Sequence, residues 1–307
     1  MTVIRKLVTD TVRLGLDLRS WRAGFRALRM PSLVIAGFSC ALGTVLAYHD
    51  GRGDLLNAIA VMAAGLALQA GVNLVNDFFE FRQRKVHDKI STYGFSAVDR
   101  QFLEVLIFLV GLAFFGLTGL LGLFLAWRSG WPILLFGLFG WIGGFFYTGE
   151  PLNYKRRGLA VTLVFFIMGV TMIAGAYYAV AGTLSWLSVL ASVPVSFLIS
   201  LILLANELRD FEADTTFGVR TLAVRIGYSN AVIVYCALLA FAYASPAVLF
   251  LLGAFPHLRL VYLALPAAVP PFLFIWRPAE QRNGIIPVVM FHHMVYGILY
   301  CFTYFIK

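Results

Sequence analysis

Long apolar segments constrain this chain of 307 residues more than any other feature of its sequence. A transmembrane helix needs about 20 consecutive apolar residues, and segments of that kind follow one another along the sequence. Their apolar residues are continuous and do not alternate, which favours helices over the strands of an outer-membrane barrel. The sequence therefore predicts an all-α, polytopic membrane helical bundle with nine transmembrane helices, at residues 30–49, 55–77, 102–126, 131–149, 159–181, 185–206, 229–252, 258–276 and 284–306.

The composition excludes several other classes of protein. The chain is 61% hydrophobic and only 13% charged, whereas an ordinary soluble domain is about half apolar and about a quarter charged. A soluble globular enzyme, a disordered chain and a nucleic-acid-binding module do not fit these values. The three cysteines lie in apolar segments without paired spacing, and we interpret them as small buried hydrophobic residues.

The basic residues predict how the chain is oriented in the membrane. With nine spans, 20 of the 24 basic residues fall on one side of the bilayer. The positive-inside rule then places the N-terminus in the cytoplasm and the C-terminus outside, in a bacterial or archaeal cytoplasmic membrane. The net charge of +9 is on this interpretation a topology signal, and no nucleic-acid partner is expected.

The first 29 residues predict a separate interfacial arm, ahead of a transmembrane domain at residues 30–307. Leu7, Leu14, Leu18, Trp21 and Phe25 share one helical face, with arginines around it. This pattern is typical of an amphipathic helix on a membrane surface. The alternative is a mobile basic arm.

Acidic residues are costly in or near a bilayer, and seven of the fifteen gather at two predicted helix ends. In the first cluster Asn73, Asp77 and Glu80 lie on one helical face, and in the second cluster the same holds for Asn206, Asp210 and Asp214. Each cluster contains the pattern Asn-x-x-x-Asp, and the two patterns lie four spans apart on the same side. We therefore expect two similar four-helix units plus one further helix.

The two clusters together predict a metal site facing a phosphorylated ligand. Carboxylate and amide oxygens suit Mg²⁺, which usually bridges a few carboxylates to substrate phosphates. Arg84, Arg209 and Arg220 interleave with the acids, as a bound diphosphate would require. The alternative is that the acids merely pair with neighbouring arginines at helix ends.

Two further places in the sequence carry polar groups. The predicted loop at residues 147–158 places Lys155 on the same side as the acidic clusters, with Tyr147 and Tyr154 close by. Its alternative is a plain turn marked by Gly and Pro. His292 and His293 in the last segment have no acidic partners, and we interpret them as packing or interfacial residues.

Two Asp-containing motifs at the ends of predicted spans two and six resemble those of the UbiA superfamily of intramembrane prenyltransferases. Three local patterns most resemble its 1,4-dihydroxy-2-naphthoate polyprenyltransferases: NLVND (73–77), YTGEPLNY (147–154) and NELRDFEADTTFGVRTLAVRIG (206–227), the last being the most specific. The segment ALRMPSL (27–33) also resembles the family's entry to the first span, which points to Arg29. Family members often carry Asp where this chain has Glu80. The resemblance covers about residues 27 to 230.

This resemblance implies the Mg²⁺-dependent transfer of a polyprenyl group from its diphosphate to 1,4-dihydroxy-2-naphthoate, with decarboxylation, giving demethylmenaquinone. Asp77, Asp210 and Lys155 would be catalytic, and Tyr147 and Tyr154 would contact the aromatic acceptor. The implied metal ligands are Asn73, Asp77, Glu80, Asn206, Asp210 and Asp214, and the implied diphosphate ligands are Arg29, Arg84, Lys155, Arg209 and Arg220.

Three other functions remain open at this point. The same fold could use another acceptor, namely 4-hydroxybenzoate, homogentisate, 1,4-dihydroxy-6-naphthoate or a lipid glycerol. A secondary transporter is the second, although transporter sites lie near the bilayer midplane and these acids lie at helix ends. A purely structural membrane subunit is the third, and it would leave the paired Asn-x-x-x-Asp patterns without a purpose.

Overall fold

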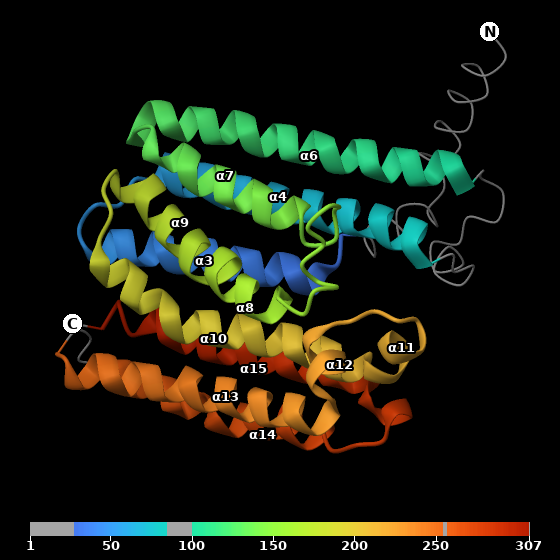
Figure 1. The fold of residues 1–307 in the computed structure, drawn as a ribbon. Helices are drawn as coiled ribbons and strands as arrows, with labels where there is room; N and C mark the ends of the chain where they lie inside the picture. The colour runs from blue at the N-terminus through green and yellow to red at the C-terminus, as the bar shows by residue number, and fades with distance from the viewer. Residues whose placement is uncertain (1–27, 85–99, 254–256, 307) are drawn as a thin grey trace, which may run out of the picture.

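A computed structural model describes residues 28–84, 100–253 and 257–306. In these ranges every regular element is a helix, as the sequence predicts (Figure 1). The interfacial arm predicted for residues 1–29 lies almost wholly outside the described residues, and so does the side chain of Arg84.

The first half of the bundle consists of four helices followed by one compound segment. The four helices are α3 (Met30–His49), α4 (Leu55–Arg84), α6 (Arg100–Ser129) and α7 (Pro132–Phe145). The compound segment joins α8 (Ala160–Val164), the π-helical turn η1 (Phe165–Thr171) and α9 (Met172–Ala181).

The second half begins with α10 (Trp186–Arg209), whose end carries two short helices, α11 (Phe211–Thr216) and α12 (Leu222–Ile226). The rest of the chain forms α13 (Tyr228–Leu251), the 3₁₀ turn η2 (Leu258–Ala264), α14 (Leu265–Phe274), the 3₁₀ turn η3 (Ala279–Gly284) and α15 (Ile285–Phe302).

Seven helical segments of the described chain are long and apolar enough to cross a membrane. The other two predicted spans, 131–149 and 258–276, form shorter apolar helices, Pro132–Phe145 and Arg259–Phe274. The first ends early because residues 146–149 turn, with the amide of Gly149 donating to the carbonyl of Phe145. The second contains Pro270 and Pro271, which remove backbone donors. The count of nine spans therefore stays a prediction.

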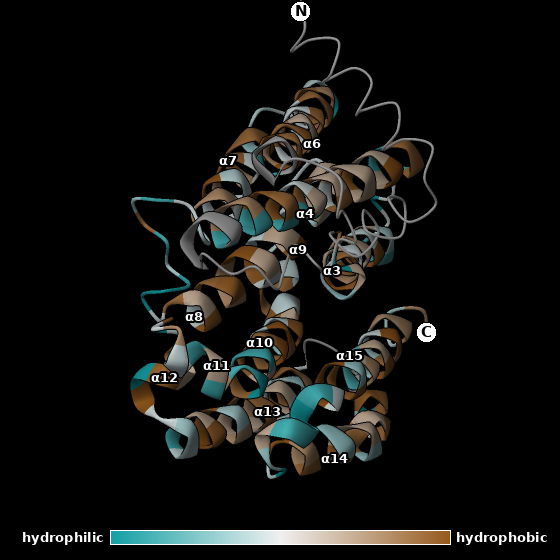
Figure 2. Ribbon diagram, turned by 90° about the vertical axis from the view of Figure 1, so that its right-hand side faces the viewer, coloured by the Kyte–Doolittle hydropathy of each residue, from teal (hydrophilic) through white to brown (hydrophobic). Residues whose placement is uncertain are grey.

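The long helices run antiparallel, so that alternate helix ends meet at each end of the bundle (Figure 1). The C-terminal ends of α4 and α10 lie at the same end of the bundle, where α11 and α12 pack against α10. Figure 2 faces this end and shows hydrophilic residues on the near ends of the helices and on the loops between them. The fold thus brings the two acidic clusters to one end, as their sequence positions predict.

Tyrosine hydroxyls hold the last helix against its neighbours. The hydroxyl of Tyr296 donates to the carbonyl of Ala242 at 2.6 Å, and that of Tyr300 donates to Ala191 at 2.8 Å. His292 and His293 are both buried in this interface, as the packing interpretation requires. Such bonds satisfy buried polar groups without water.

Close packing of α3 on α9 depends on Gly43. A Cβ atom at this position would lie 2.3 Å from the carbonyl oxygen of Ile173 and 2.7 Å from the Cβ of Ala176. Only glycine therefore permits the two backbones to approach this closely, which is a common device between membrane helices.

We expect Gly43→Ala to lower the thermal unfolding midpoint in detergent, because overpacking costs about 1–3 kcal/mol. Gly37→Ala on the same helix is the matched control, since its Cβ would meet only Leu66 Cδ2 at 3.8 Å. Equal midpoints for the two variants would show that the α3–α9 approach does not limit stability.

Candidate active site

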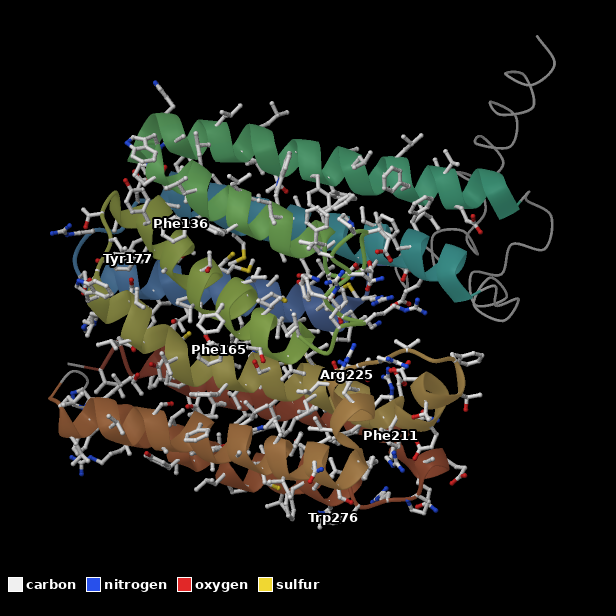
Figure 3. All side chains as sticks on the ribbon, viewed as in Figure 1. Phe136, Phe165, Tyr177, Phe211, Arg225 and Trp276 are labelled. Atoms are coloured by element: carbon white, nitrogen blue, oxygen red, sulfur yellow. The ribbon has the colours of Figure 1, made fainter. Side chains whose placement is uncertain are left out.

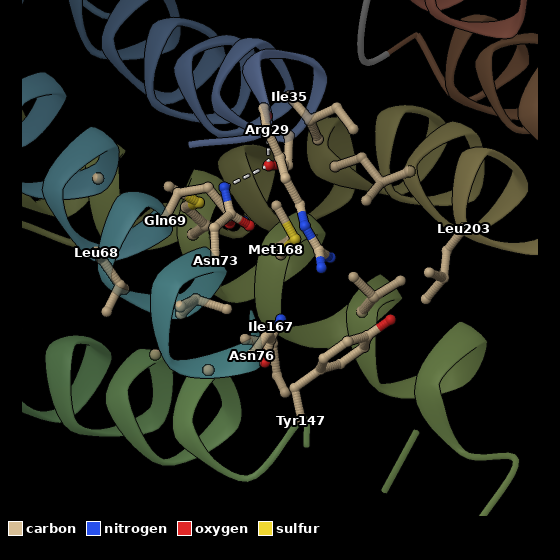
Figure 4. Close-up of a pocket in the computed structure, with 18 of the residues that line it drawn as sticks. Arg29, Ile35, Leu68, Gln69, Asn73, Asn76, Tyr147, Ile167, Met168 and Leu203 are labelled. Atoms are coloured by element: carbon tan, nitrogen blue, oxygen red, sulfur yellow. Dashed lines mark hydrogen bonds between the residues drawn. The ribbon is translucent and has the colours of Figure 1, made fainter. Parts of the chain in front are cut away.

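A cavity of about 710 Å³ runs into the bundle from the end that carries the acidic clusters. At that end its lining is polar and comes from the start of α3, the end of α4, the 147–158 loop, the end of α10, α11 and the residue before α12. These residues are Arg29, Asn73, Asn76, Glu80, Tyr147, Tyr154, Lys155, Asn206, Glu207, Arg209, Asp210, Asp214 and Thr221. Figure 4 shows Arg29, Asn73, Asn76 and Tyr147 around this space.

The deeper part of the cavity is apolar. Its walls come from α4, α6, α7, η1, α9 and α10, and include Leu68, Gly122, Leu125, Phe136, Gly137, Met168, Met172 and Gly175. Figure 3 shows how far Phe136 lies from Arg225, which marks the polar end. The cavity therefore joins a charged end to a long apolar arm.

Cations from two distant parts of the chain reach the first acidic cluster. Nη2 of Arg29 lies 2.5 Å from Oδ1 of Asp77 and 3.5 Å from Oε2 of Glu80. Nζ of Lys155 lies 2.6 Å from Oε1 of Glu80. Asp77 and Glu80 are adjacent on one face of α4, so the two cations share one carboxylate pair.

Asn73 fixes the segment that carries Arg29. Its Nδ2 donates to the carbonyl of Leu28 at 2.6 Å and to Oγ of Ser32 at 2.8 Å. Its Oδ1 in turn accepts from Nε2 of Gln69 at 3.0 Å. Arg29 itself adopts the left-handed backbone conformation, φ 49°, just before α3 begins. One turn of α4 thus positions the arginine at the cavity mouth.

The loop after α7 positions Lys155. Backbone hydrogen bonds close the loop. The amide of Tyr154 donates to the carbonyl of Phe146 at 3.2 Å, and the amide of Lys155 donates to the carbonyl of Tyr147 at 3.0 Å. The hydroxyl of Tyr154 donates to the carbonyl of Gly143 at 2.6 Å. Nζ of Lys155 lies 5.7 Å from the ring centre of Tyr147, so that cation and ring lie together in the lining.

Burial opposes the charges of Arg29 and Lys155, and the nearby carboxylates outweigh that effect. The pKa of Arg29 is raised by Asp77 and Glu80, and the pKa of Lys155 is raised mainly by Glu80. Both side chains therefore stay protonated at neutral pH. They present two fixed positive charges at the cavity.

The second acidic cluster lies where α10 ends. Arg209 pairs with Asp210 through two bonds of 2.8 and 2.7 Å. Asn206 Nδ2 donates to the carbonyl of Ile202 at 3.1 Å, and Asp214 is buried. Because α11 begins immediately after Asp210, the shared helical face predicted for this cluster is divided between two helices.

The structure places most predicted site residues at the cavity, with three exceptions. Asp77 contacts Arg29 but is not among the lining residues, and Arg220 is exposed outside the lining. Arg84 has no described side chain. Conversely, Asn76, Glu207 and Thr221 line the cavity and were not predicted as site residues. Asn76 could have been predicted from the sequence, because it lies three residues after Asn73 and so shares its helical face.

The oxygen atoms at the cavity fit Mg²⁺ by their chemistry, since the lining supplies carboxylates and amides from both clusters. Among the described side chains, no three His, Cys, Asp or Glu residues approach closely enough to hold a metal ion by themselves. Asp77, Glu80 and Asp210 pair with cations of the site.

Comparison with known proteins identifies the family. The model of the UbiA prenyltransferase family matches residues 36–295. The chain belongs to the UbiA prenyltransferase family. The resemblance in its motifs is thereby confirmed, and the protein is an integral membrane enzyme of the prenyltransferase class.

Two relatives show how far the similarity of this UbiA family member extends. The 1,4-dihydroxy-2-naphthoate octaprenyltransferase of Bacillus subtilis is 31% identical over 244 residues, covering 79% of this chain and 78% of the relative. UbiA prenyltransferase domain-containing protein 1 of Danio rerio is 30% identical, covering 94% and 87%.

Solved structures confirm the UbiA fold. A UbiA homolog from Archaeoglobus fulgidus, solved with GPP and Mg²⁺, is similar at a TM-score of 0.63 and 17% identity, covering 92% of this chain and 98% of that one. An apo UbiA homolog from Aeropyrum pernix K1 has a TM-score of 0.65 at 15% identity, covering 86% and 96%.

Proposed function

We propose that this enzyme transfers a polyprenyl group from polyprenyl diphosphate to 1,4-dihydroxy-2-naphthoate, with loss of CO₂, on the way to demethylmenaquinone. The observation that carries the proposal is a cavity in which a charged end continues into an apolar arm. A polyprenyl diphosphate has the same division into a polyanion and a long hydrocarbon. Relatives named as 1,4-dihydroxy-2-naphthoate octaprenyltransferases support the choice of acceptor.

The charged end would bind the diphosphate and stabilise it as the leaving group. Arg29, Lys155 and Arg209 line this end, and their charges are fixed before the substrate arrives. Groups that are already aimed at developing charge supply a large part of catalysis. Breaking the allylic C–O bond leaves the bonding electrons on the diphosphate, where these cations would neutralise them.

Mg²⁺ would be held by Asn73, Asp77 and Glu80 on one side, and by Asn206, Asp210 and Asp214 on the other. When bound, it would neutralise part of the diphosphate charge and thereby ease departure of the leaving group. The similar Archaeoglobus fulgidus protein was solved with GPP and Mg²⁺, which supports this cofactor.

The prenyl carbon would next form a bond with the electron-rich ring of the acceptor. The new bond would form at the ring carbon that carries the carboxylate, the C–CO₂ bond would break with its electrons returning to the ring, and CO₂ would leave. Diphosphate would depart with the electrons of the allylic C–O bond, so that the step needs no added proton and gives the hydroquinone. Tyr147 and Tyr154 lie in the lining beside Lys155, and their rings pack edge to face at 5.4 Å. Aromatic faces stabilise a cationic centre, and the apolar arm excludes water from it.

We also propose that the polar end of the cavity faces the cytoplasm. By the antiparallel order of the helices, Arg156, Arg157, Arg225, Arg277 and Arg282 lie at this end, and Arg52, Arg128 and Arg259 at the other. The positive-inside rule supports this orientation.

The purified enzyme is expected to prenylate 1,4-dihydroxy-2-naphthoate faster than 4-hydroxybenzoate or homogentisate when a long-chain prenyl diphosphate and Mg²⁺ are supplied. Chelation with EDTA should abolish turnover, because the diphosphate charge is then only partly neutralised, and added Mg²⁺ should restore it. Product formation is followed by chromatography and mass spectrometry. Preference for another acceptor would overturn the acceptor assignment, and full turnover in EDTA would overturn the metal assignment.

A further inference from the structure

Glu207 is an acid at the cavity to which neither the motifs nor the proposed chemistry give a role. It lies on α10, one residue after Asn206, and only 4% of its surface is exposed. Its Oε2 accepts a hydrogen bond from the backbone amide of Ala223 at 3.0 Å. Its other oxygen, Oε1, is buried and has no hydrogen-bond partner within the described part of the chain.

Thr221 repeats this pattern on the neighbouring element. It directly precedes α12, the short helix whose Ala223 amide holds Glu207. Its side chain is fully buried and lines the same cavity, and its hydroxyl also lacks a partner among the described residues. A buried polar group without a partner is rare in native proteins and needs an explanation. Here two such groups lie on connected elements around one cavity.

The charges at the site restrict what could bind these two groups. A diphosphate oxygen would be repelled by the Glu207 carboxylate, and Arg29, Lys155 and Arg209 already serve the diphosphate. Lys155 is close enough for its charge to interact with Glu207, but no hydrogen bond joins them among those of the described residues. A neutral hydroxyl fits both groups, because it donates one hydrogen bond to a carboxylate and accepts another from a threonine.

We propose that Glu207 and Thr221 together bind one ring hydroxyl of the aromatic acceptor and so set its position in the cavity. This inference rests on the proposed function, which supplies an acceptor with two hydroxyl groups. The hydroxyl donates to Oε1 of Glu207 and accepts from the Thr221 hydroxyl. Both partners are positioned before the acceptor binds. The backbone amide of Ala223 donates a hydrogen bond to Glu207, and the backbone amide of Thr221 donates one to the carbonyl of Val219 at 3.0 Å. The two residues select acceptors that carry a hydroxyl at this place.

The test compares Glu207→Gln and Thr221→Val with the wild-type enzyme in steady-state kinetics. Acceptor, prenyl diphosphate and Mg²⁺ are varied in turn. A hydrogen bond to a charged group is worth enough to raise the KM for 1,4-dihydroxy-2-naphthoate about tenfold in Glu207→Gln. The KM for prenyl diphosphate and the half-saturating Mg²⁺ concentration should stay within about twofold. Glu280→Gln, which removes an exposed acid on η3, is the matched control and should change none of these values.

Two acceptor analogues, each lacking one of the two hydroxyl groups, separate a direct contact from a purely structural role. A purely structural role would not change how strongly loss of one hydroxyl weakens inhibition. The analogues are measured as competitive inhibitors of wild-type and variant enzymes. For the wild-type enzyme, loss of the bound hydroxyl should weaken inhibition about tenfold. For Glu207→Gln the same loss should have little further effect, because the partner is already gone. Thr221→Val should give the same pattern, so it carries the test if Glu207→Gln does not fold.

Two results would overturn the inference while leaving the proposed function intact. One is a raised Mg²⁺ requirement with an unchanged acceptor KM, which would make Glu207 a metal ligand. The other is equal sensitivity of wild-type and variant enzymes to loss of either hydroxyl. Failure of the proposed function is distinguishable from both, since the wild-type enzyme would then not prenylate 1,4-dihydroxy-2-naphthoate at all.

Discussion

Replacing Asp77 by asparagine is expected to lower kcat by about 100-fold or more, the effect typical of losing one preorganised electrostatic contact at a reacting centre. Asp77 holds the guanidinium of Arg29 at 2.5 Å and would also be a ligand of Mg²⁺. Asparagine keeps the shape of the side chain and removes its charge. Both the metal and the arginine would then bind the leaving group less well.

The fold should survive this substitution. Nδ2 of Asn73, one turn earlier on α4, still holds the segment of Arg29 through Leu28 and Ser32. Turnover is measured at saturating prenyl diphosphate and Mg²⁺, together with the thermal unfolding midpoint in detergent. A midpoint close to that of the wild-type protein would assign the lost activity to the site.

Asp54→Asn is the matched control for Asp77→Asn. Asp54 also pairs with an arginine, since its Oδ2 lies 2.8 Å from Nη2 of Arg128, but it lies outside the cavity lining. Its other oxygen accepts from the amide of Asn57 at the start of α4, and asparagine can still do so. We expect kcat to stay within about twofold, a change of less than 0.5 kcal/mol in the barrier. Wild-type turnover by Asp77→Asn, or an equal loss in Asp54→Asn, would refute the role of Asp77.

Continuous apolar segments predicted where the helices lie, and the order of the predicted spans placed the two acidic clusters at the same end of the bundle. The apolar segment 30–49 coincides with α3, whereas the segment 55–77 continues as α4 to Arg84. Asp77 is the last residue of the predicted span, and Glu80 lies in the extension that hydropathy alone does not include. They remain helical and buried because Arg29 and Lys155 neutralise them.

Contacts between distant segments could not be derived from spacing. Arg29 lies 48 residues before Asp77 in the sequence, and Lys155 lies 75 residues after Glu80. No local pattern therefore indicates that the two cations contact the same carboxylate pair. Glu207 was not predicted as a site residue because Asn206 and Asp210, four residues apart, share one helical face, and Glu207 lies on another. It lines the cavity because α12 folds back onto α10 and binds it.

The site roles of individual residues stay predictions. Arg220 illustrates the reason, because its position between the second acidic cluster and α12 suggested a diphosphate ligand. Its carbonyl accepts from Nε of Arg225 at 3.0 Å, and its side chain is exposed outside the cavity lining. Sequence proximity to a cluster therefore does not decide whether a side chain reaches the substrate.

Replacing Lys155 by methionine is expected to lower kcat/KM for prenyl diphosphate by about 100-fold, because one of the cations that would neutralise the leaving group is lost. Methionine retains most of the side-chain length and packing but not the charge. Arg157→Met is the matched control, since Arg157 is exposed in the same loop and its Nη2 contacts only the carbonyl of Pro151 among the described residues. Its kcat/KM should remain within about twofold of the wild-type value, a barrier change under 0.5 kcal/mol.

Exchanging the two charges separates a diphosphate ligand from a structural ion pair. In the wild-type structure Nζ of Lys155 and Oε1 of Glu80 lie 2.6 Å apart. In the double variant Lys155→Glu with Glu80→Lys, opposite charges still face each other at this place. The unfolding midpoint should therefore recover most of what Lys155→Glu alone loses. Activity should not recover, because a carboxylate then occupies the loop position that would face the diphosphate, and the α4 position loses a potential metal ligand. If the pair only joins the loop to α4, activity and midpoint will recover together.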